Sequence, residues 1–485
     1  MENVLLLTYF VSLCVLFAFG LHGLVMIYFW HRTAKLAKVK AMDLPDDALP
    51  VVTMQLPFYN ELYVVERLVR AVCEMDYPKE KLEIQLLDDS TDETVELSKA
   101  LVEEYKTKGF DIKHIHRTDR SGYKAGALKE GLAVARGEFV AIFDADFVPR
   151  VDFLKKTIPH FADGKVGMVQ TRWEHLNEDY SFLTRAQALA LDGHFVVEQQ
   201  IRHRAGFFIN FNGTAGVWRK RTIQDAGNWH SDTLAEDLDL SYRAQLRGWR
   251  FIFLNDVTSP AELPADINSL KTQQFRWTKG AVETAKKLLP MVWRSDLPIV
   301  TKLESTVHLT SNIVFPFIIL VAFLNVPVVI IKNEVVGFDA YFNMMSIFVL
   351  ASVSTFLFYL YAQRDIHGDW QRRLLLFPVF MAGSMGLAVN NTKAVVEAIV
   401  GKKSEFKRTP KYRIENSNDD WRTKRYVQKR ISWIVLVELG LAAYFMFGII
   451  TSISYLEIAA IPFQLMFFLG FGTVGFLSLR HALGR

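Results

Sequence analysis

The 485-residue sequence contains only two cysteines, Cys14 and Cys73, and its net charge is only +4. One cysteine lies in an apolar segment and the other in a polar one, so neither a disulfide framework nor a cysteine metal site is predicted. The small net charge argues against nucleic acid as a partner. No Lys or Arg precedes the first apolar segment, which also exceeds the apolar length of a signal peptide. We therefore expect this segment to be a retained membrane span.

Hydrophobic residues make up 51% of the chain, but they are concentrated in three regions. These regions are residues 3–30, most of 306–400 and most of 432–480. Residues 31–305 have the charge density of a globular domain. The sequence therefore predicts a multi-pass membrane protein with a large water-facing domain inserted after its first span.

The Lys and Arg residues beside the spans predict the orientation in the membrane. Glu2 is the only charged side chain before the first apolar segment, whereas Arg32, Lys35, Lys38 and Lys40 follow it. We expect the amino terminus outside and the inserted domain in the cytosol. Four further spans are predicted, near residues 306–331, 341–361, 432–451 and 455–479.

The apolar segment 374–399 is long enough to cross the bilayer, but eleven Lys and Arg follow it within 401–431. A crossing would place this basic loop outside, against the positive-inside rule. The second half of the segment also contains polar side chains that fit hydrocarbon poorly, namely Asn390, Asn391, Lys393 and Glu397. We predict an interfacial or re-entrant helix here and five spans in total, whereas hydropathy alone indicates six.

Strand and helix patterns alternate in the inserted domain. Strands are predicted at 51–57, 82–89, 111–117 and 138–146, and helices at 61–75, 92–108 and 123–136. This alternation indicates a mostly parallel, Rossmann-like α/β sheet. Such sheets bind ligands at the carboxyl ends of their strands. Asp88 and Asp89 end the second strand and Asp144 and Asp146 end the fourth, so we expect four carboxylates at one rim.

Asp144 and Asp146 occupy alternate positions of an extended segment and therefore point to one side. Two such carboxylates suit Mg²⁺ or Mn²⁺, which take phosphate oxygens as further ligands. Surface turns also produce this motif, so the evidence for a metal site comes mainly from the apolar strand that precedes it. Asp88 and Asp89 have the chemistry to accept from a nucleoside base and ribose, whereas the residues that follow them would simply cap the next helix.

Three further segments have two interpretations each. Lys124, at a predicted helix start with small neighbours, suits a diphosphate, but a solvated lysine fits equally well. Glu236 and Asp237 open an amphipathic helix, where acids suit the helix dipole and where a general base for an acceptor hydroxyl is also plausible. "TQQFRWTKG" (272–280) holds an arginine and a tryptophan about thirty residues before an apolar region, where tryptophan often marks the membrane surface.

Seven motifs occur in order over about 51–280: PFYNE, DDSTDET, KAGAL, DAD, NFNGTAGVWRK, AEDLDLSYRA and QQFRW. Together they resemble the family 2 glycosyltransferases of GT-A fold, in particular the cellulose-synthase-like branch that includes plant glucomannan synthases. The resemblance implies a nucleotide-sugar site formed by Glu61, Asp88, Asp89, Lys124, Asp144, Gln273 and Arg276. It implies an acceptor site formed by Asn212, Gly213, Thr214, Glu236 and Trp277. It also implies that Asp144 and Asp146 hold the metal and that Asp237 is the catalytic base of an inverting reaction.

The last motif then has a function. The resemblance implies that Arg276 holds the donor diphosphate, for which its forked guanidinium is suited, and that Trp277 stacks on the terminal acceptor sugar. The segment "EFKRTPKYR" (405–413) resembles the F-x-V-T-x-K gating segment of cellulose synthases. Its matching positions are Phe406, Arg408, Thr409 and Lys411. Arg408 departs from the valine of that pattern, and a solvated basic loop near anionic lipid is the alternative.

These expectations divide the chain into an amino-terminal transmembrane helix (1–31), a cytosolic GT-A domain (32–305) and a transmembrane channel region (306–485). The expected interfacial helices lie near 178–203, 268–294 and 374–400, and the gating-type loop spans 401–415.

The predicted function is transfer of a sugar from UDP-glucose or GDP-mannose to a growing β-linked polysaccharide, with export across the bilayer. Addition of one sugar to a membrane lipid, as in ceramide glucosyltransferases, is the alternative, and a non-enzymatic channel or scaffold is a remote one. The expected location is the bacterial inner membrane, or the Golgi in a eukaryote. Accessory subunits are left open.

Overall fold

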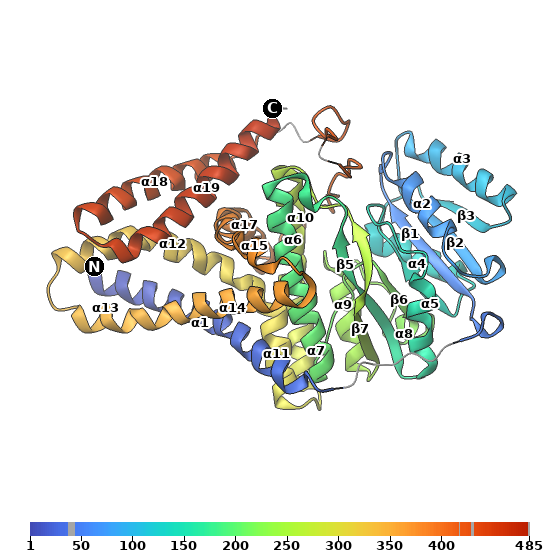
Figure 1. The fold of residues 1–485 in the computed structure, drawn as a ribbon, viewed down its shortest axis with the longest axis horizontal. Helices are drawn as coiled ribbons and strands as arrows, with labels where there is room; N and C mark the ends of the chain where they lie inside the picture. Colours follow the sequence, from blue (N-terminus) through green and yellow to red (C-terminus); the bar gives the residue numbers. More distant parts are fainter. Residues whose placement is uncertain (37–43, 417, 428–430, 484–485) are drawn as a thin grey trace.

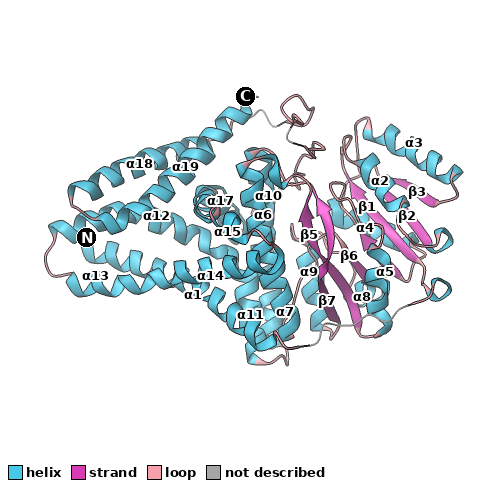
Figure 2. Ribbon diagram, viewed as in Figure 1, coloured by secondary structure: helices cyan, strands magenta, loops and turns pink. Residues whose placement is uncertain are grey.

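The computed structural model describes residues 1–36, 44–416, 418–427 and 431–483. An α/β domain lies at one end of the molecule and a group of long helices at the other (Figure 1). In the described part of the chain, all strands belong to the α/β domain (Figure 2). The amino-terminal end of the first long helix and the carboxyl-terminal end of the last one both lie in the helical half (Figure 1).

The domain is built on a seven-stranded sheet with the order β3-β2-β1-β4-β6-β5-β7. The strands are β1 (Val52–Phe58), β2 (Leu82–Asp88), β3 (Asp111–His116), β4 (Phe139–Ile142), β5 (Val166–His175), β6 (Gly216–Arg219) and β7 (Arg250–Ala261). The first four are parallel, β6 is antiparallel to both of its neighbours, and β5 is parallel to β7. This mostly parallel sheet confirms the predicted α/β class, and β1 to β4 are the four predicted strands.

Alternation along the strands explains why both faces of the sheet are covered. In β4, Ala141 belongs to the apolar cluster that contains α2 (Val65–Cys73) and α3 (Thr94–Thr107). Its neighbours Val140 and Ile142 belong to the cluster on the other side, which contains α4 (Tyr123–Val134). Successive side chains of a strand point to opposite faces, so a continuous apolar run is buried on both. The three helices correspond to the three predicted helical segments.

The second half of the domain contributes shorter helices and one long one. They are α5 (Phe153–Thr157), α6 (Phe182–Asp192), α7 (Gln200–Ala205), α8 (Lys220–Asp225), α9 (Glu236–Leu246) and α10 (Ile267–Arg294), with a π-helix (Gly193–Gln199) between α6 and α7. Asp266 caps α10 by accepting from the backbone N–H groups of Asn268 and Ser269. The helices α6, α7 and α10 lie between the sheet and the long helices (Figure 1). They coincide with the segments predicted to be interfacial, and that position relative to a membrane stays a prediction.

Among the described residues, five helical segments are long and apolar enough to cross a membrane, or six if the bent pair 370–399 is counted as one span. They are α1 (Glu2–Thr33), α11 with α12 (Ile299–Thr310 and Val314–Glu334), α13 with α14 (Asp339–Met345 and Val349–Ile366), α18 (Ile434–Ser454) and α19 (Ile461–Ala482). Each coincides with a span predicted from the sequence. The chain therefore has the architecture of a multi-pass membrane protein.

The segment that was predicted to be interfacial or re-entrant is a bent helix pair. Trp370–Gly386, which contains α15 (Trp370–Leu374) and α16 (Phe377–Gly386), meets α17 (Ala388–Ile399) at 45°. The polar side chains of α17 face α10: the amide of Asn390 donates to the carbonyl of Lys271, and Glu397 pairs with Lys279 at 3.3 Å. Asn390 and Glu397 are thus satisfied by protein, as buried polar groups near a bilayer require.

Candidate active site

A single cavity at the carboxyl ends of β1, β2 and β4 collects most of the predicted site residues. It is closed on one side by α10 and on another by the loop after α17. The predicted residues that line it are Glu61, Asp89, Lys124, Asp144, Asp146, Asn212, Gly213, Glu236, Asp237, Gln273, Arg276, Trp277, Phe406, Arg408, Thr409 and Lys411. Segments more than 300 residues apart in the sequence (Glu61 and Lys411) therefore meet at one place.

Asp144 and Asp146 follow β4 directly and project into the cavity. The backbone N–H of Asp144 donates to Oγ1 of Thr214 at 2.9 Å. Its Oδ1 accepts from Nζ of Lys124 at 2.5 Å, and this ammonium also donates to the carbonyl of Gly213. Burial by itself would lower the pKa of Lys124, but the carboxylates of Asp144 and Glu236 outweigh it and hold that pKa above its usual value.

The loop at 401–415 places two cations on acidic residues of the same cavity. Nζ of Lys411 lies 2.5 Å from Oδ2 of Asp146, and Nη1 of Arg408 lies 3.2 Å from Oε2 of Glu61. Burial raises the pKa of Glu61 to about 7, although Arg408 and Lys411 act in the opposite direction. The arginine that departs from the valine of the gating pattern therefore has a defined partner.

Asp237 stands at the first turn of α9 and lines the cavity. Its Oδ1 accepts from the backbone N–H of Leu238 at 2.8 Å. Burial, together with the neighbouring Glu236, raises the pKa of Asp237 to about 7. Gly213 faces it with a φ of +78°, and a Cβ at this position would lie only 3.0 Å from Oδ2 of Asp237. A glycine thus satisfies both the backbone conformation and the close approach.

Gly280 of α10 sets the position of the first turn of α9. A Cβ on Gly280 would lie 2.8 Å from both Cβ and the backbone nitrogen of Ala235, the residue before α9. The helix that carries Arg276 and Trp277 can therefore approach Asp237 closely only if residue 280 has no side chain.

We expect Gly280→Ala to lower kcat about 10²-fold, because a shift of about 1 Å in a catalytic group costs this much. Turnover of the purified variant, with its thermal melting as a check of folding, measures the effect. Gly440→Ala is the matched control, since a Cβ on Gly440 of α18 meets nothing within 4 Å. An unchanged kcat in Gly280→Ala would contradict this account of the helix packing.

Aromatic side chains surround Trp277, the residue predicted to hold the acceptor sugar. The ring of Trp277 lies 6.4 Å from that of Trp173, which packs in turn against Phe147 and Phe195. Since both tryptophans line the cavity, an apolar face is available there for the C–H face of a sugar.

The gating-type loop also reaches the cation of the Q-x-x-R-W motif. The guanidinium of Arg276 lies 4.5 Å from the centroid of the Phe406 ring, within cation–π distance. The same ring stacks on Tyr123 at 5.9 Å. Phe406 therefore lies between the predicted diphosphate-binding arginine and the start of α4.

Two predicted site residues lie beneath the cavity surface. Asp88 is fully buried, accepts from the backbone N–H of Ser90 at 2.8 Å and contacts Nε2 of His114 at 2.8 Å. Thr214 is 1% exposed and accepts from the backbone of Asp144. Thr214 thus holds Asp144, which lines the cavity, whereas the partners of Asp88 do not line it. Neither Asp88 nor Thr214 is itself a lining residue.

The sequence analysis missed Tyr59, Arg120 and Trp173, all of which line the cavity. The guanidinium of Arg120 lies 3.4 Å from the centroid of the Tyr59 ring, which makes a flat cationic surface beside Asp89. Tyr59 belongs to the PFYNE motif and Arg120 precedes KAGAL, so proximity to those motifs was the available signal.

Asp144 and Asp146 have the oxygen donors that Mg²⁺ or Mn²⁺ prefers, with room beside them for phosphate oxygens. Each carboxylate is paired with a lysine at 2.5 Å, and each has a second oxygen that a metal ion is able to use as a ligand. These two residues therefore fit a divalent metal.

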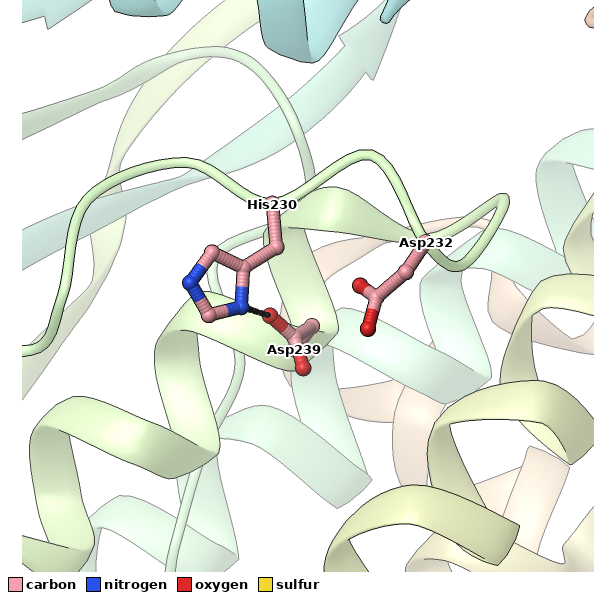
Figure 3. A group of neighbouring side chains, drawn as sticks. All are labelled: His230, Asp232 and Asp239. Carbon is pink, nitrogen blue, oxygen red and sulfur yellow. Dashed lines mark ion pairs between the residues drawn. The ribbon is translucent and has the colours of Figure 1, made fainter.

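A second cluster of possible metal ligands does not fit one. His230, Asp232 and Asp239 lie together beside the start of α9 (Figure 3). The ammonium of Lys287 lies 2.8 Å from each carboxylate and 3.1 Å from Nδ1 of the histidine. Because this ammonium already supplies the positive charge, the cluster is a link between α9 and α10.

Residues 50–280 match the model of the glycosyltransferase-like family 2. This part of the chain is therefore similar to the glycosyltransferases of family 2, as the seven motifs predicted.

Two curated plant proteins are similar to this domain. Glucomannan 4-beta-mannosyltransferase 1 of Oryza sativa subsp. japonica is 43% identical over 258 residues, which cover 52% of this chain and 50% of that protein. Glucomannan 4-beta-mannosyltransferase 2 of Arabidopsis thaliana is 39% identical over 292 residues, which cover 58% and 55%. The similarity thus spans about half the length of the curated relatives.

A solved structure agrees with the fold. Mannosyltransferase PcManGT from Pyrobaculum calidifontis, in complex with GDP-Man and Mn²⁺, has a TM-score of 0.56 and 19% identity to this chain. The match covers 82% of this chain and 100% of the other. The predicted GT-A fold is confirmed.

Proposed function

We propose that this chain is a membrane-embedded, inverting hexosyltransferase that adds a sugar from a nucleotide sugar to the end of a β-linked polysaccharide. The observation that carries the proposal is the meeting of Asp237, the Asp144–Asp146 pair and Trp277 around one cavity. The two plant relatives are named 4-beta-mannosyltransferases, which supports GDP-mannose as the first donor to test and leaves UDP-glucose as the second.

In the proposed reaction Asp237 accepts the proton of an acceptor hydroxyl. The hydroxyl oxygen forms a bond to the anomeric carbon while the bond from that carbon to the diphosphate oxygen breaks. Attack from the face opposite the leaving group inverts the anomeric centre and requires one base. Trp277 holds the acceptor sugar by stacking, which fixes the hydroxyl near the base.

The donor diphosphate binds on the cationic side of the cavity in this proposal. Lys124 and Arg276 line it there and bond phosphate oxygens well. Asp144 and Asp146 would hold Mg²⁺ or Mn²⁺, which when bound supplies a Lewis acid for the departing diphosphate. Mn²⁺ accompanies GDP-Man in PcManGT, which supports a divalent ion in the same role here.

Export of the product is the second part of the proposal. The helix α10 carries Trp277 and lies between the sheet and the spans (Figure 1). The part of the cavity beside Trp277 therefore faces the helical half of the molecule. A cytosolic catalytic domain and an external amino terminus, as the basic residues after α1 predict, would direct the chain outward.

A donor panel tests this function. Purified protein is offered radiolabelled GDP-mannose and UDP-glucose, and the product is sized and its linkages analysed. We expect long products with β-1,4-linked mannose from GDP-mannose. A product that carries one added sugar on a lipid would contradict the polymer proposal and favour the single-addition alternative.

We expect kcat to rise with pH and to level off above about pH 7, because the Asp237 carboxylate must be deprotonated to act as base. Its pKa is raised, so the inactive protonated form dominates below that value, and each further pH unit lowers kcat about tenfold. A profile of kcat against pH at saturating donor measures this fall at low pH, which we call the acid limb. Glu61→Gln is the control, because the pKa of the Glu61 carboxyl is also raised to about 7. If the acid limb disappears in this variant, the fall in kcat is due to Glu61 and not to Asp237.

A further inference from the structure

A second cavity of about 490 Å³ adjoins the active site on the side of the membrane helices. It lies between α10, α17, the first part of the 401–415 loop and the start of α18. Arg276 lines both cavities. The proposed transfer reaction uses the first cavity and leaves the second without a function.

Positive charge dominates the wall of this second cavity. Its charged lining residues are Lys271, Arg276, Lys393, Lys402, Lys407, Glu397 and Glu405. Lys271 pairs with Glu438 at 2.7 Å and Lys402 with Glu397 at 3.1 Å. Against these satisfied pairs stand three cations and one solvent-exposed carboxylate, Glu405. Arg276 also faces the carboxylates of the active-site cavity, so Lys393 and Lys407 are the cations that leave this wall with net positive charge.

Lys393 is the residue of this wall that most clearly lacks a counterion. It is half-buried on α17, and its ammonium lies 5.7 Å from the centroid of the Phe275 ring. Within the described part of the chain, Lys393, Lys407 and Arg276 have no carboxylate within ion-pair distance. Lys407 is exposed to solvent, whereas Lys393 is half-buried. Burying a cation without a counterion is costly, so an anionic ligand beside Lys393 would stabilise it.

Exposed apolar side chains follow Lys393 on α17 and precede α18, and we call those of α17 the apolar rim. Val396 and Ile399 on α17 and Val400 just after it are 48%, 55% and 69% exposed, and Trp433, just before α18, is 61% exposed. The span α18 begins at Ile434, which lines the cavity. The mouth therefore lies where a span starts, at the depth at which tryptophan and lipid headgroups are found.

We propose that this second cavity binds the phosphate headgroup of an anionic membrane lipid, with the acyl chains on the apolar rim of α17. Lys393 and Lys407 neutralise the phosphate, as basic residues beside a span do for anionic lipids. Free phosphate has the same headgroup chemistry but nothing to cover the rim. The bound lipid also contacts Arg276, which lines the active-site cavity as well.

Lipid binding to the full chain, purified in neutral detergent without any donor, tests the proposal. Native mass spectrometry compares phosphatidylglycerol with phosphatidylcholine of identical acyl chains. We expect the wild type to bind phosphatidylglycerol about tenfold more tightly. The Lys393→Gln/Lys407→Gln variant should lose this preference, whereas Lys393→Arg/Lys407→Arg should keep it. Lys302→Gln/Lys403→Gln, which removes two lysines outside this cavity, is the matched control.

Three results would overturn the proposal. The first is equal affinity of the wild type for the two lipids. The second is an unchanged preference in Lys393→Gln/Lys407→Gln. The third is displacement of the lipid by glycerol 3-phosphate at equal concentration, which would assign the cavity to a soluble phosphate. Because the assay contains no nucleotide sugar, its outcome is independent of the proposed transferase activity.

Discussion

Asp237→Asn is expected to lower kcat about 10³-fold while donor affinity changes little. Loss of a positioned general base costs about 10² to 10⁴ in rate, and asparagine has nearly the same shape but accepts no proton at neutral pH. Asp237 is not one of the carboxylates that pair with Lys124 or Lys411, so the donor and metal contacts should survive. Single-turnover kinetics, together with equilibrium binding of the nucleotide sugar, separate these two effects.

The control for this experiment is Asp225→Asn, which makes the same chemical change at an exposed position on α8. It should keep wild-type kcat. Wild-type turnover in Asp237→Asn would remove this residue from the role of base and make Glu236, its neighbour in the cavity, the next candidate. Loss of donor binding along with turnover would instead assign Asp237 to the donor site.

Much of the fold was predictable because its signals are local. Each of β1 to β4 is a short apolar run that is followed by a helical pattern, and parallel strands bring their carboxyl ends to one rim. The order of the elements in the sequence was therefore enough to predict that Asp144 and Asp146 lie at this edge of the sheet. The spans were predictable for the same reason, since length and hydropathy are properties of one segment.

The second half of the sheet was not predicted. β6 has only four residues and lies between β4 and β5, to both of which it is antiparallel. Such a short strand has no reliable periodicity. Its insertion between strands that come earlier in the chain depends on contacts over tens of residues. The cation–π pair of Arg120 and Tyr59 was missed for a similar reason.

The gating-type loop illustrates what motif resemblance can and cannot supply. Its match to F-x-V-T-x-K predicted a position at the mouth of the active site, and its residues line that cavity. The partner of Arg408, the one position that departs from the pattern, could not be read because Glu61 lies 347 residues earlier in the chain. A buried carboxylate and a substituted arginine are each unusual alone, and together they form an ion pair.

Asp146→Asn is expected to reduce turnover about 10³-fold, and metal chelation should have an equally large effect on the wild type. Asparagine keeps the shape of Asp146 but loses the charge that suits Mg²⁺ or Mn²⁺, and the Lewis-acid contribution of the metal would be lost with it. Turnover measured against added Mn²⁺ tests this, because the variant should need far more metal or remain inactive at any concentration.

Lys411 makes this prediction specific to the present structure. Its ammonium lies 2.5 Å from Asp146, so a metal ion and this lysine compete for one carboxylate unless the loop moves. Lys411→Met should therefore lower the Mn²⁺ concentration needed for half-maximal donor binding, whereas Asp146→Asn should raise it. Asp232→Asn is the control, because the cluster around Asp232 already contains the ammonium of Lys287. An unchanged metal requirement in both Asp146→Asn and Lys411→Met would place the metal elsewhere.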